Sequence, residues 1–194
     1  MKRLLALSAL LAFAVVAARA NVETYKIDPV HSSAGFSLRH VLSKFSSSFT
    51  SVNGTLTLDR DNLENSHVEA TIDVGALNTA TAKRDAHLKS PDFFDVARFP
   101  LMTFKSKAWK KTGEKTYDIT GDLTIRDVTK EVVLHATLDG FGPGMMPGTA
   151  LTAWEATTVL NRKDFGVNGP AMLGTALGDE VTVNISVEAG AKSG

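Results

Sequence analysis

Apolar and polar residues alternate along most of this sequence, and this period of two constrains the fold more than any other feature. Residues 68–74 alternate without a fault, and residues 117–126 follow the same pattern. Successive side chains of a strand point to opposite faces, so such runs predict strands with one buried and one solvated face. Strands of a parallel sheet are buried on both faces and would be apolar throughout. The pattern therefore predicts an antiparallel sheet.

Similar runs recur along the chain and suggest about nine short strands. The further candidates are residues 22–27, 33–40, 52–58, 101–109, 132–138, 151–160 and 181–187. Turn-forming residues at 111–114, 127–130 and 140–144 separate several of them. Many short strands with hairpin-length connections are typical of an up-and-down barrel or a sandwich. No linker or internal repeat divides the chain, so we expect a single domain over residues 21–194.

Three segments depart from the strand pattern. Residues 79–89 predict a helix with Thr79 or Thr81 as its N-cap. Residues 90–95 begin with Ser-Pro-Asp and predict a second short helix, because proline is tolerated in a first helical turn. The serine-rich residues 40–47 are expected to form an irregular connection.

The first twenty residues have the composition of a secretory signal. A basic start precedes an apolar run and an Ala-x-Ala exit ending at Ala20. The apolar run is shorter than the about 20 residues of a membrane span. We expect cleavage after Ala20, which removes Lys2, Arg3 and Arg19 from a chain of 21 basic and 21 acidic residues. The charge balance of the mature protein is then slightly acidic and gives no indication of a nucleic-acid partner.

The absence of cysteine limits both the cellular compartment expected for this protein and the kinds of active site that it can contain. It excludes disulfides, thiolate metal sites and a cysteine nucleophile. An exported protein without disulfides fits the bacterial periplasm better than a eukaryotic secretory route. Neither H-E-x-x-H nor G-x-S-x-G occurs. His31, His40 and His87 lie near predicted element ends, but their spacing matches no metal template, so we expect no metal, cofactor or catalytic site.

Aromatic and small residues suggest an apolar interior with space inside. Loops are usually polar, yet six phenylalanines fall in predicted connections: Phe45, Phe93, Phe94, Phe99, Phe141 and Phe165. These rings either line the mouth of an apolar barrel or form satellite clusters beneath long connections. Small residues on predicted inward faces favour a cavity, with bulges as the alternative for the glycines: Gly54, Ala70, Gly121, Ala136 and Ala153.

One face of the predicted helix combines polar and apolar side chains. Arg84, His87 and Leu88 lie on the same face at helical spacing. This face could hold a polar head group while an apolar chain enters the barrel. The alternative is an internal ion pair between Arg84 and a strand carboxylate, and the sequence leaves both open. For the neighbouring Asp85, a structural role is favoured.

A series of short motifs, in the same order along the chain, resembles the YceI-like family of periplasmic, lipocalin-like barrels. The motifs include YKIDPVHS at 25–32, GFSLRH at 35–40, RDAHL at 84–88, PDFFD at 91–95, GDLTI at 121–125, NRKDFGV at 161–167 and GDEV at 178–181. Together they span essentially the whole mature chain. They are specific as a set, although no single motif is.

The resemblance implies an all-β, antiparallel, up-and-down lipocalin-like barrel of about eight strands, with one or two short helices in the connections. It also implies a long apolar cavity that binds polyisoprenoid chains or related lipids, without an established reaction. By position, the residues bordering this cavity would be Phe36, Phe93, Phe94, Phe104 and Phe165. The polar residues near its mouth would be His31, His40, Arg84, His87, Asn161 and Arg162.

The sequence departs from the family pattern at two positions. Ser47 and Asp127 stand where the family usually has glycine. Both are expected in turns, where aspartate is well tolerated. Because Ser47 replaces the usual glycine, the sequence does not determine the shape of the first loop or of the entrance on that side.

We therefore expect an exported periplasmic protein that binds, sequesters or carries a long-chain polyisoprenoid or related lipid. One alternative is a quinone-binding redox accessory protein, and a less favoured one is a hydrolase acting on an isoprenoid lipid. The sequence leaves open whether the protein forms a homodimer or contacts a membrane surface or a membrane redox partner.

Overall fold

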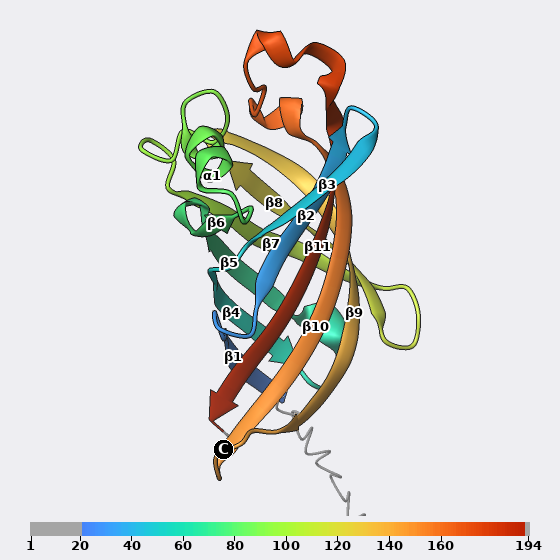
Figure 1. Ribbon diagram of the computed structural model, residues 1–194. Helices are drawn as coiled ribbons and strands as arrows, with labels where there is room; N and C mark the ends of the chain where they lie inside the picture. The colour runs from blue at the N-terminus through green and yellow to red at the C-terminus, as the bar shows by residue number, and fades with distance from the viewer. Residues whose placement is uncertain (1–20, 193–194) are drawn as a thin grey trace, which may run out of the picture.

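The computed structural model describes residues 21–192 as a closed antiparallel barrel (Figure 1). Its strands are β1 (Val22–Ile27), β2 (Ser33–His40), β3 (Ser43–Phe49), β4 (Val52–Asp59), β5 (His67–Asp73), β6 (Leu77–Asn78), β7 (Leu101–Lys111), β8 (Thr116–Ile125), β9 (Val128–Pro143), β10 (Thr149–Asn161) and β11 (Leu177–Lys192). Its helices are α1 (Ala82–Lys89) and the short 3-10 helices η1 (Leu63–Asn65), η2 (Val74–Ala76), η3 (Arg162–Phe165) and η4 (Ala171–Ala176). The predicted signal sequence, residues 1–20, lies outside the described residues.

The eleven strands occupy eight positions around the barrel, because three positions hold two strands placed end to end. β11 pairs with β2 through Ser186 and then with β1 at Ala189 and Gly190, so β1 and β2 follow one another along it. In the same way β3 and β4 lie along β2 and β1, and β5 and β6 lie along β4 and β3. All pairings are antiparallel. The predicted up-and-down, lipocalin-like barrel of about eight strands is therefore confirmed.

Four local predictions are wrong. Residues 40–47 are not an irregular connection but the β2–β3 hairpin, whose second strand is serine-rich and therefore lacks apolar alternation. Residues 90–95 form turns instead of a second helix, and Asp95 ends them with φ 50°. β9 continues through residues 140–143, so its turn follows Pro143. The turn after β8 is Arg126–Asp127, because Val128 already pairs with Ile125.

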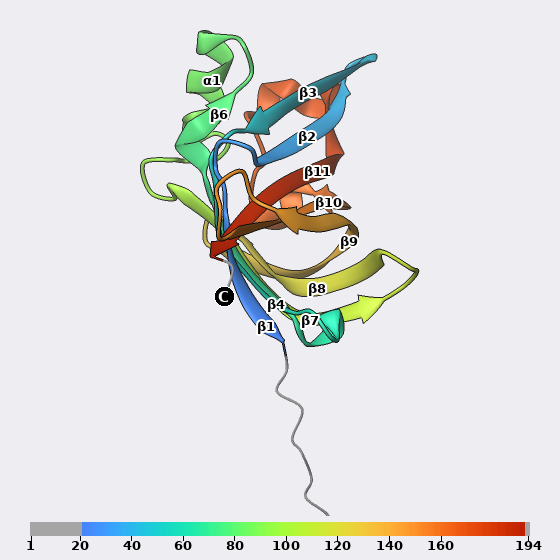
Figure 2. The ribbon, with the colours of Figure 1, turned by 90° about the horizontal axis from the view of Figure 1, so that it is seen from below.

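α1 covers one end of the barrel rather than a face of the sheet (Figures 1 and 2). It begins after Thr81, one of the two predicted N-caps, and none of its residues is buried. The carboxylate of Asp85 accepts bonds from the Thr79 amide at 2.8 Å and the Thr79 hydroxyl at 2.5 Å, which ties α1 to the preceding turn. None of the helices within residues 21–192 has the length and apolar character needed to cross a membrane.

Aromatic side chains fill the opposite end of the barrel. Trp109 meets Trp154 nearly edge to face, with ring centroids 5.4 Å apart, and Tyr117 lies 5.9 Å from Trp154. All three are buried. Nearby, the Arg60 guanidinium stacks 3.8 Å above the ring of Phe141. Such edge-to-face packing adds to the stabilisation from burial itself, so this end of the barrel is a packed core.

Gly121 of β8 provides a test of this packing. A Cβ atom there would lie 2.5 Å from Cζ of Phe104 and 2.6 Å from the carbonyl oxygen of Lys105. The register of β7 also shifts opposite it, between Ser106 and Ala108. Gly121 therefore marks a bulge and a close approach. We expect Gly121→Ala to lower the free energy of unfolding by about 1–3 kcal/mol in urea denaturation.

Gly140→Ala in β9 is the matched control, because nothing lies within 4 Å of a Cβ atom added there. It should change the free energy of unfolding by less than about 0.5 kcal/mol. Equal losses in the two variants would show that Gly121 is not needed for close packing.

Candidate functional site

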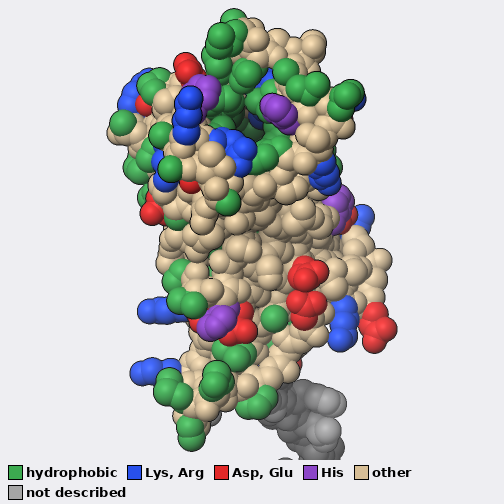
Figure 3. Space-filling view, in the orientation of Figure 1, with side chains coloured by type: hydrophobic (Ala, Val, Ile, Leu, Met, Phe, Trp, Pro, Cys, Tyr) green, Lys and Arg blue, Asp and Glu red, His purple; other side chains and the backbone are tan. Residues whose placement is uncertain are grey.

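An apolar cavity of about 570 Å³ occupies the part of the barrel that the aromatic core leaves unfilled. It opens beside α1, where Figure 3 shows a hollow lined by hydrophobic side chains with lysine, arginine and histidine around its rim. The alternation of the strands builds the lining. On β11, for example, Val181, Val183, Ile185 and Val187 point inward while the residues between them point out.

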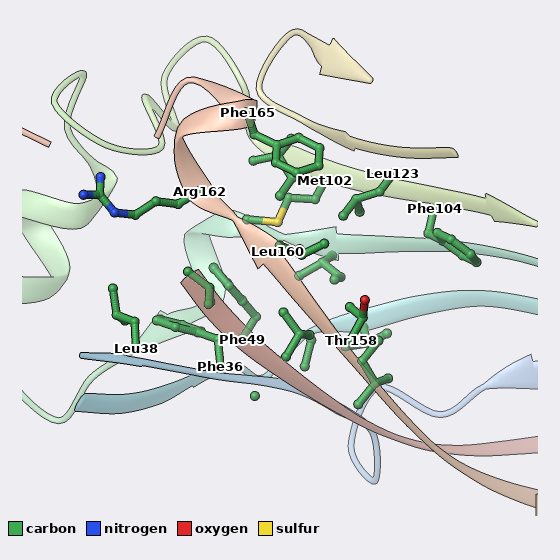
Figure 4. A pocket seen from close by; sticks show the side chains of 18 of the residues that line it. Phe36, Leu38, Phe49, Met102, Phe104, Leu123, Thr158, Leu160, Arg162 and Phe165 are labelled. Atoms are coloured by element: carbon green, nitrogen blue, oxygen red, sulfur yellow. The ribbon is translucent and has the colours of Figure 1, made fainter. Parts of the chain in front are cut away.

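Phenylalanines from strands and connections meet in the wall of this cavity. Phe36 and Phe49 lie 5.5 Å apart between ring centroids, and Phe94 meets Phe49 edge to face at 5.6 Å. Phe165, on η3, points into the same cavity as Met102 and Leu160 (Figure 4). All five phenylalanines predicted to border the cavity line it: Phe36, Phe93, Phe94, Phe104 and Phe165.

The other aromatic and small residues divide between the two ends. Phe45 lies on β3 and Phe141 on β9, so neither is in a connection. Phe45 lines the mouth, whereas Phe141 packs against Tyr25 at the closed end. Ala70 and Ala136 line the cavity as predicted. Ala153 does not, because it alternates with the buried Thr152 and Trp154 and therefore lies on the outward face of β10.

Arg84 lies at the mouth with part of its guanidinium bound to its own helix start. Its Nε donates to the Thr79 hydroxyl at 3.0 Å, and its Nη2 donates to the Thr79 carbonyl at 2.7 Å and the Thr81 hydroxyl at 3.2 Å. The guanidinium also stacks 4.6 Å from the centre of the Phe45 ring. The alternative ion pair with a strand carboxylate does not occur among the described residues. Hydrogen bonds from Thr79 hold the pKa of Asp85 below its ordinary value.

Other polar side chains share this mouth. Nε2 of His87 lies 3.1 Å from a carboxylate oxygen of Asp92, and its ring meets Phe93 edge to face. His40 lines the mouth from the end of β2, and Lys44 does so from the start of β3. Lys44 could not be identified from the sequence because its segment was predicted to be irregular.

Thr158 places a hydroxyl inside the otherwise apolar wall (Figure 4). It is buried, and it lies on β10 between Ala156 and Leu160, which also line the cavity. Its position in the alternation of β10 could have indicated that it points inward. Because threonine is polar, the sequence pattern did not distinguish Thr158 from the outward-facing residues.

His31 and Asn161 were predicted near the mouth, and the structure places neither in the cavity lining. His31 bonds Asp28 at 2.8 Å and faces Glu188, which raises the pKa of the imidazole. Ser33 lies seven residues along β2 from His40, and its partner Ser186 lies two residues from Glu188, which together give a separation of roughly 30 Å along the strands. His31 therefore cannot share a site with His40 and His87. Asn161 is exposed and caps η3 by accepting a bond from the Lys163 amide at 3.0 Å.

Arg162 reaches the cavity only with its side-chain stem, and its guanidinium is turned away (Figure 4). The guanidinium is buried and donates to five acceptors that border η3 and η4. These are the carbonyls of Val167, Asn168, Leu177 and Gly178 and a carboxylate oxygen of Asp179. Lys163 and Arg162 together hold the pKa of Asp179 below its usual range. Arg162 thus fixes the backbone around the mouth and has little capacity left for a head group.

The two departures from the family pattern have different local structures. Ser47 lies within β3, not in a turn, and its hydroxyl donates to the Asn78 carbonyl at 2.6 Å. Asp127 does lie in a turn, but the positive φ of 57° falls on Arg126. The Arg126 guanidinium donates to the carbonyls of Phe93 at 3.0 Å and Gly166 at 2.7 Å. It therefore ties two segments of the mouth together.

We expect Arg162→Lys to destabilise the protein substantially, because a single ammonium cannot satisfy carbonyls spread around a planar guanidinium. The loss should exceed about 2 kcal/mol in urea denaturation, since buried acceptors are left without donors. Lys163→Ala is the control, because Lys163 is half exposed and contacts Asp179 at the surface. A wild-type unfolding midpoint for Arg162→Lys would contradict this structural role.

Comparison with known proteins agrees with this geometry. The YceI-like domain family matches residues 25–189. A UPF0312 protein of Pseudomonas syringae pv. tomato is 36% identical over 185 residues, which cover 94% of this chain and 96% of the relative.

Two solved structures share the fold. BcnA of Burkholderia cenocepacia superposes with a TM-score of 0.73 at 20% identity, covering 84% of this chain and 98% of BcnA. A domain from Saccharophagus degradans, described as polyisoprenoid-binding, superposes with a TM-score of 0.65 at 13% identity, covering 86% and 98%. The family match over nearly all described residues shows that this chain belongs to the YceI-like family.

Proposed function

We propose that this protein binds a long-chain polyisoprenoid or related lipid in its barrel and carries it through the periplasm. The observation that carries the proposal is the distribution of polarity in the cavity. The walls are apolar apart from Thr158, and the polar side chains Lys44, Arg84 and His87 lie at the open end. An amphiphile with one polar end and a long hydrocarbon chain matches this arrangement. The polyisoprenoid-binding description of a structural relative supports the same ligand class.

The energetics favour recognition of the chain over recognition of the head. Burying a methylene group is worth about 0.8 kcal/mol, whereas a hydrogen bond to a charged group contributes about 1.5–3 kcal/mol. A chain of several isoprene units therefore outweighs any single contact at the mouth. Affinity should rise with chain length until the cavity is filled, and the head group should adjust it.

The mouth offers a specific contact for an anionic or polar head. Arg84 uses Nε and Nη2 for its own helix start, which leaves Nη1 to donate. The bonds to Thr79 and the contact with Phe45 hold the guanidinium in place at the rim. His87, although it bonds Asp92, lies on the same helix and also lines the cavity.

The predicted signal sequence supports transport in the periplasm, where such a lipid needs a carrier because its chain is insoluble in water. Binding without turnover is the simplest activity for this cavity. A quinone with an isoprenoid tail belongs to the same ligand class. It remains the second candidate because its ring could contact the phenylalanines or Thr158.

Ala70→Trp tests whether the cavity holds the ligand chain. Ala70 lines the cavity and pairs with Phe104 of β7, so an indole there occupies the space proposed for lipid. We expect the lipid-free variant to keep a near-wild-type melting temperature and to lose most of its binding of the longest isoprenoid alcohols. Calorimetry on lipid-stripped protein measures both quantities.

Glu69→Trp is the control for this variant, because Glu69 is exposed and pairs with Lys105 on the outer face. It should leave lipid binding unchanged. A large fall in the melting temperature of lipid-free Ala70→Trp, or undiminished lipid uptake, would contradict an open cavity at this position.

Arg84→Ala tests the head-group contact. A guanidinium gives a pyrophosphate charge-assisted bonds that are about twice as strong as neutral ones. The variant should therefore weaken binding of a polyprenyl pyrophosphate more than binding of the matching alcohol. Lys83→Ala, one residue away on α1 and outside the cavity lining, should affect neither ligand. Equal losses for both ligands in Arg84→Ala would leave Arg84 a purely structural role.

A further inference from the structure

The most exposed aliphatic side chains at the open end of the barrel belong to the β2–β3 hairpin and η4. Leu42 is 91% exposed and Met172 is 89% exposed, and Val41 next to Leu42 is half exposed. Side chains of this kind scattered singly need no explanation. Val41, Leu42 and Met172, which we call the mouth tip, lie on segments that touch each other. The Val41 amide donates to the Ala176 carbonyl at 2.6 Å, which joins the hairpin to η4.

The mouth tip is continuous with the entrance of the cavity. His40 and Lys44, on either side of the hairpin turn, both line the cavity, and so does Leu173, next to Met172. Figure 1 shows the hairpin and η4 projecting beyond the barrel at the end that α1 covers. A surface that contacts the mouth tip would therefore lie directly at the opening.

The charges on the two segments that carry the mouth tip are of one sign. Residues 39–44 contain Arg39 and Lys44, and neither they nor residues 168–177 contain an acidic residue. Two acidic side chains lie next to these segments and already have partners: Asp92, whose backbone carbonyl accepts a bond from the Gly169 amide, contacts His87, and Asp179 bonds Arg162 and Lys163. Exposed aliphatic side chains flanked by cations match an anionic lipid surface, which combines an apolar interior with negative head groups.

The backbone at the hairpin turn supports a role for these side chains. Val41 has φ 54°, a conformation that favours glycine or asparagine and is rare for a β-branched residue. A two-residue hairpin turn normally places glycine or asparagine at such a position. Because half of the Val41 side chain stays exposed, burial within the protein offsets little of the cost of this conformation. Its side chain is explained if it is buried in a partner.

We propose that the mouth tip is a docking surface for an anionic bilayer, through which the lipid enters and leaves the cavity. The inference rests on the proposed lipid-binding function and adds its partner. Docking places the opening against the bilayer, so the hydrocarbon chain can pass between membrane and cavity with little exposure to water. The cations approach the head groups, while Leu42 and Met172 enter the region between head groups and chains.

The test compares two double variants that remove similar exposed side chains from opposite ends of the molecule. Leu42→Ser with Met172→Ser alters the mouth tip. Met145→Ser with Met146→Ser alters the β9–β10 turn, where both methionines are exposed. Binding is measured by flotation with vesicles of phosphatidylethanolamine and phosphatidylglycerol. We expect the mouth-tip variant to lose about tenfold in vesicle binding, because it loses two apolar side chains to insert, and the control to bind like wild type.

Further measurements make the result decisive. Wild-type binding should weaken in high salt and on vesicles of phosphatidylcholine alone, because part of the attraction is electrostatic. Equal vesicle binding by the two double variants would overturn the proposal. So would a mouth-tip variant that changes self-association instead, measured by light scattering, because the surface would then join two copies of the chain.

Binding of geranylgeraniol without vesicles separates docking from cavity binding. The mouth-tip variant should bind this alcohol like wild type, which would confirm an intact cavity and locate its defect in docking. If wild type binds vesicles but not the alcohol, lipid binding in the cavity fails while the docking surface stands.

Discussion

The mutual packing of Trp109, Tyr117 and Trp154 determines how the rest of the barrel can be used. These three side chains close one end of an eight-position barrel, with Trp154 edge to face against Trp109 and Tyr117 and a tilted contact between the latter two. An interior of this size can be filled by its own side chains or can hold one ligand. Because the tryptophans and Tyr117 gather at one end, the space between them and the phenylalanines of the cavity wall is left to smaller inward residues such as Ala70, Val183 and Ile185. The cavity is the consequence.

At the open end, irregular segments have backbone carbonyls without partners in the sheet. The guanidinium groups of two arginines donate hydrogen bonds to these carbonyls. Arg162 donates to the segments around η3 and η4, and Arg126 joins the turn at Phe93 to the end of η3. Buried carbonyls must find donors, and a guanidinium supplies several in one plane. The basic side chains near the mouth therefore divide into two kinds. Arg126 and Arg162 fix the backbone segments around the mouth, whereas Arg84 and Lys44 remain available to contact a ligand at the rim.

The sequence predicts the barrel well because apolar residues recur at every second position along most strands. The alternation in β5, β8 and β11 needs no tertiary information, and the motif order places the cavity phenylalanines correctly. The failures occur where that signal is weak or where distant segments meet. β3 is almost all serine outside Phe45 and Phe49, and Thr158 is polar although it points inward. His31 lies between the end of β1 and the start of β2, whereas His40 lies at the far end of β2. The two histidines therefore lie at opposite ends of the barrel, although both stand next to a strand end in the sequence.

Mass spectrometry of lipid extracted from the protein, purified without detergent from its native host, tests the central claim most directly. The account predicts one long-chain amphiphile per protein molecule, with an isoprenoid chain and a polar end, and its loss from the Ala70→Trp variant. Protein that is consistently free of lipid, or that carries a small water-soluble molecule instead, would contradict it.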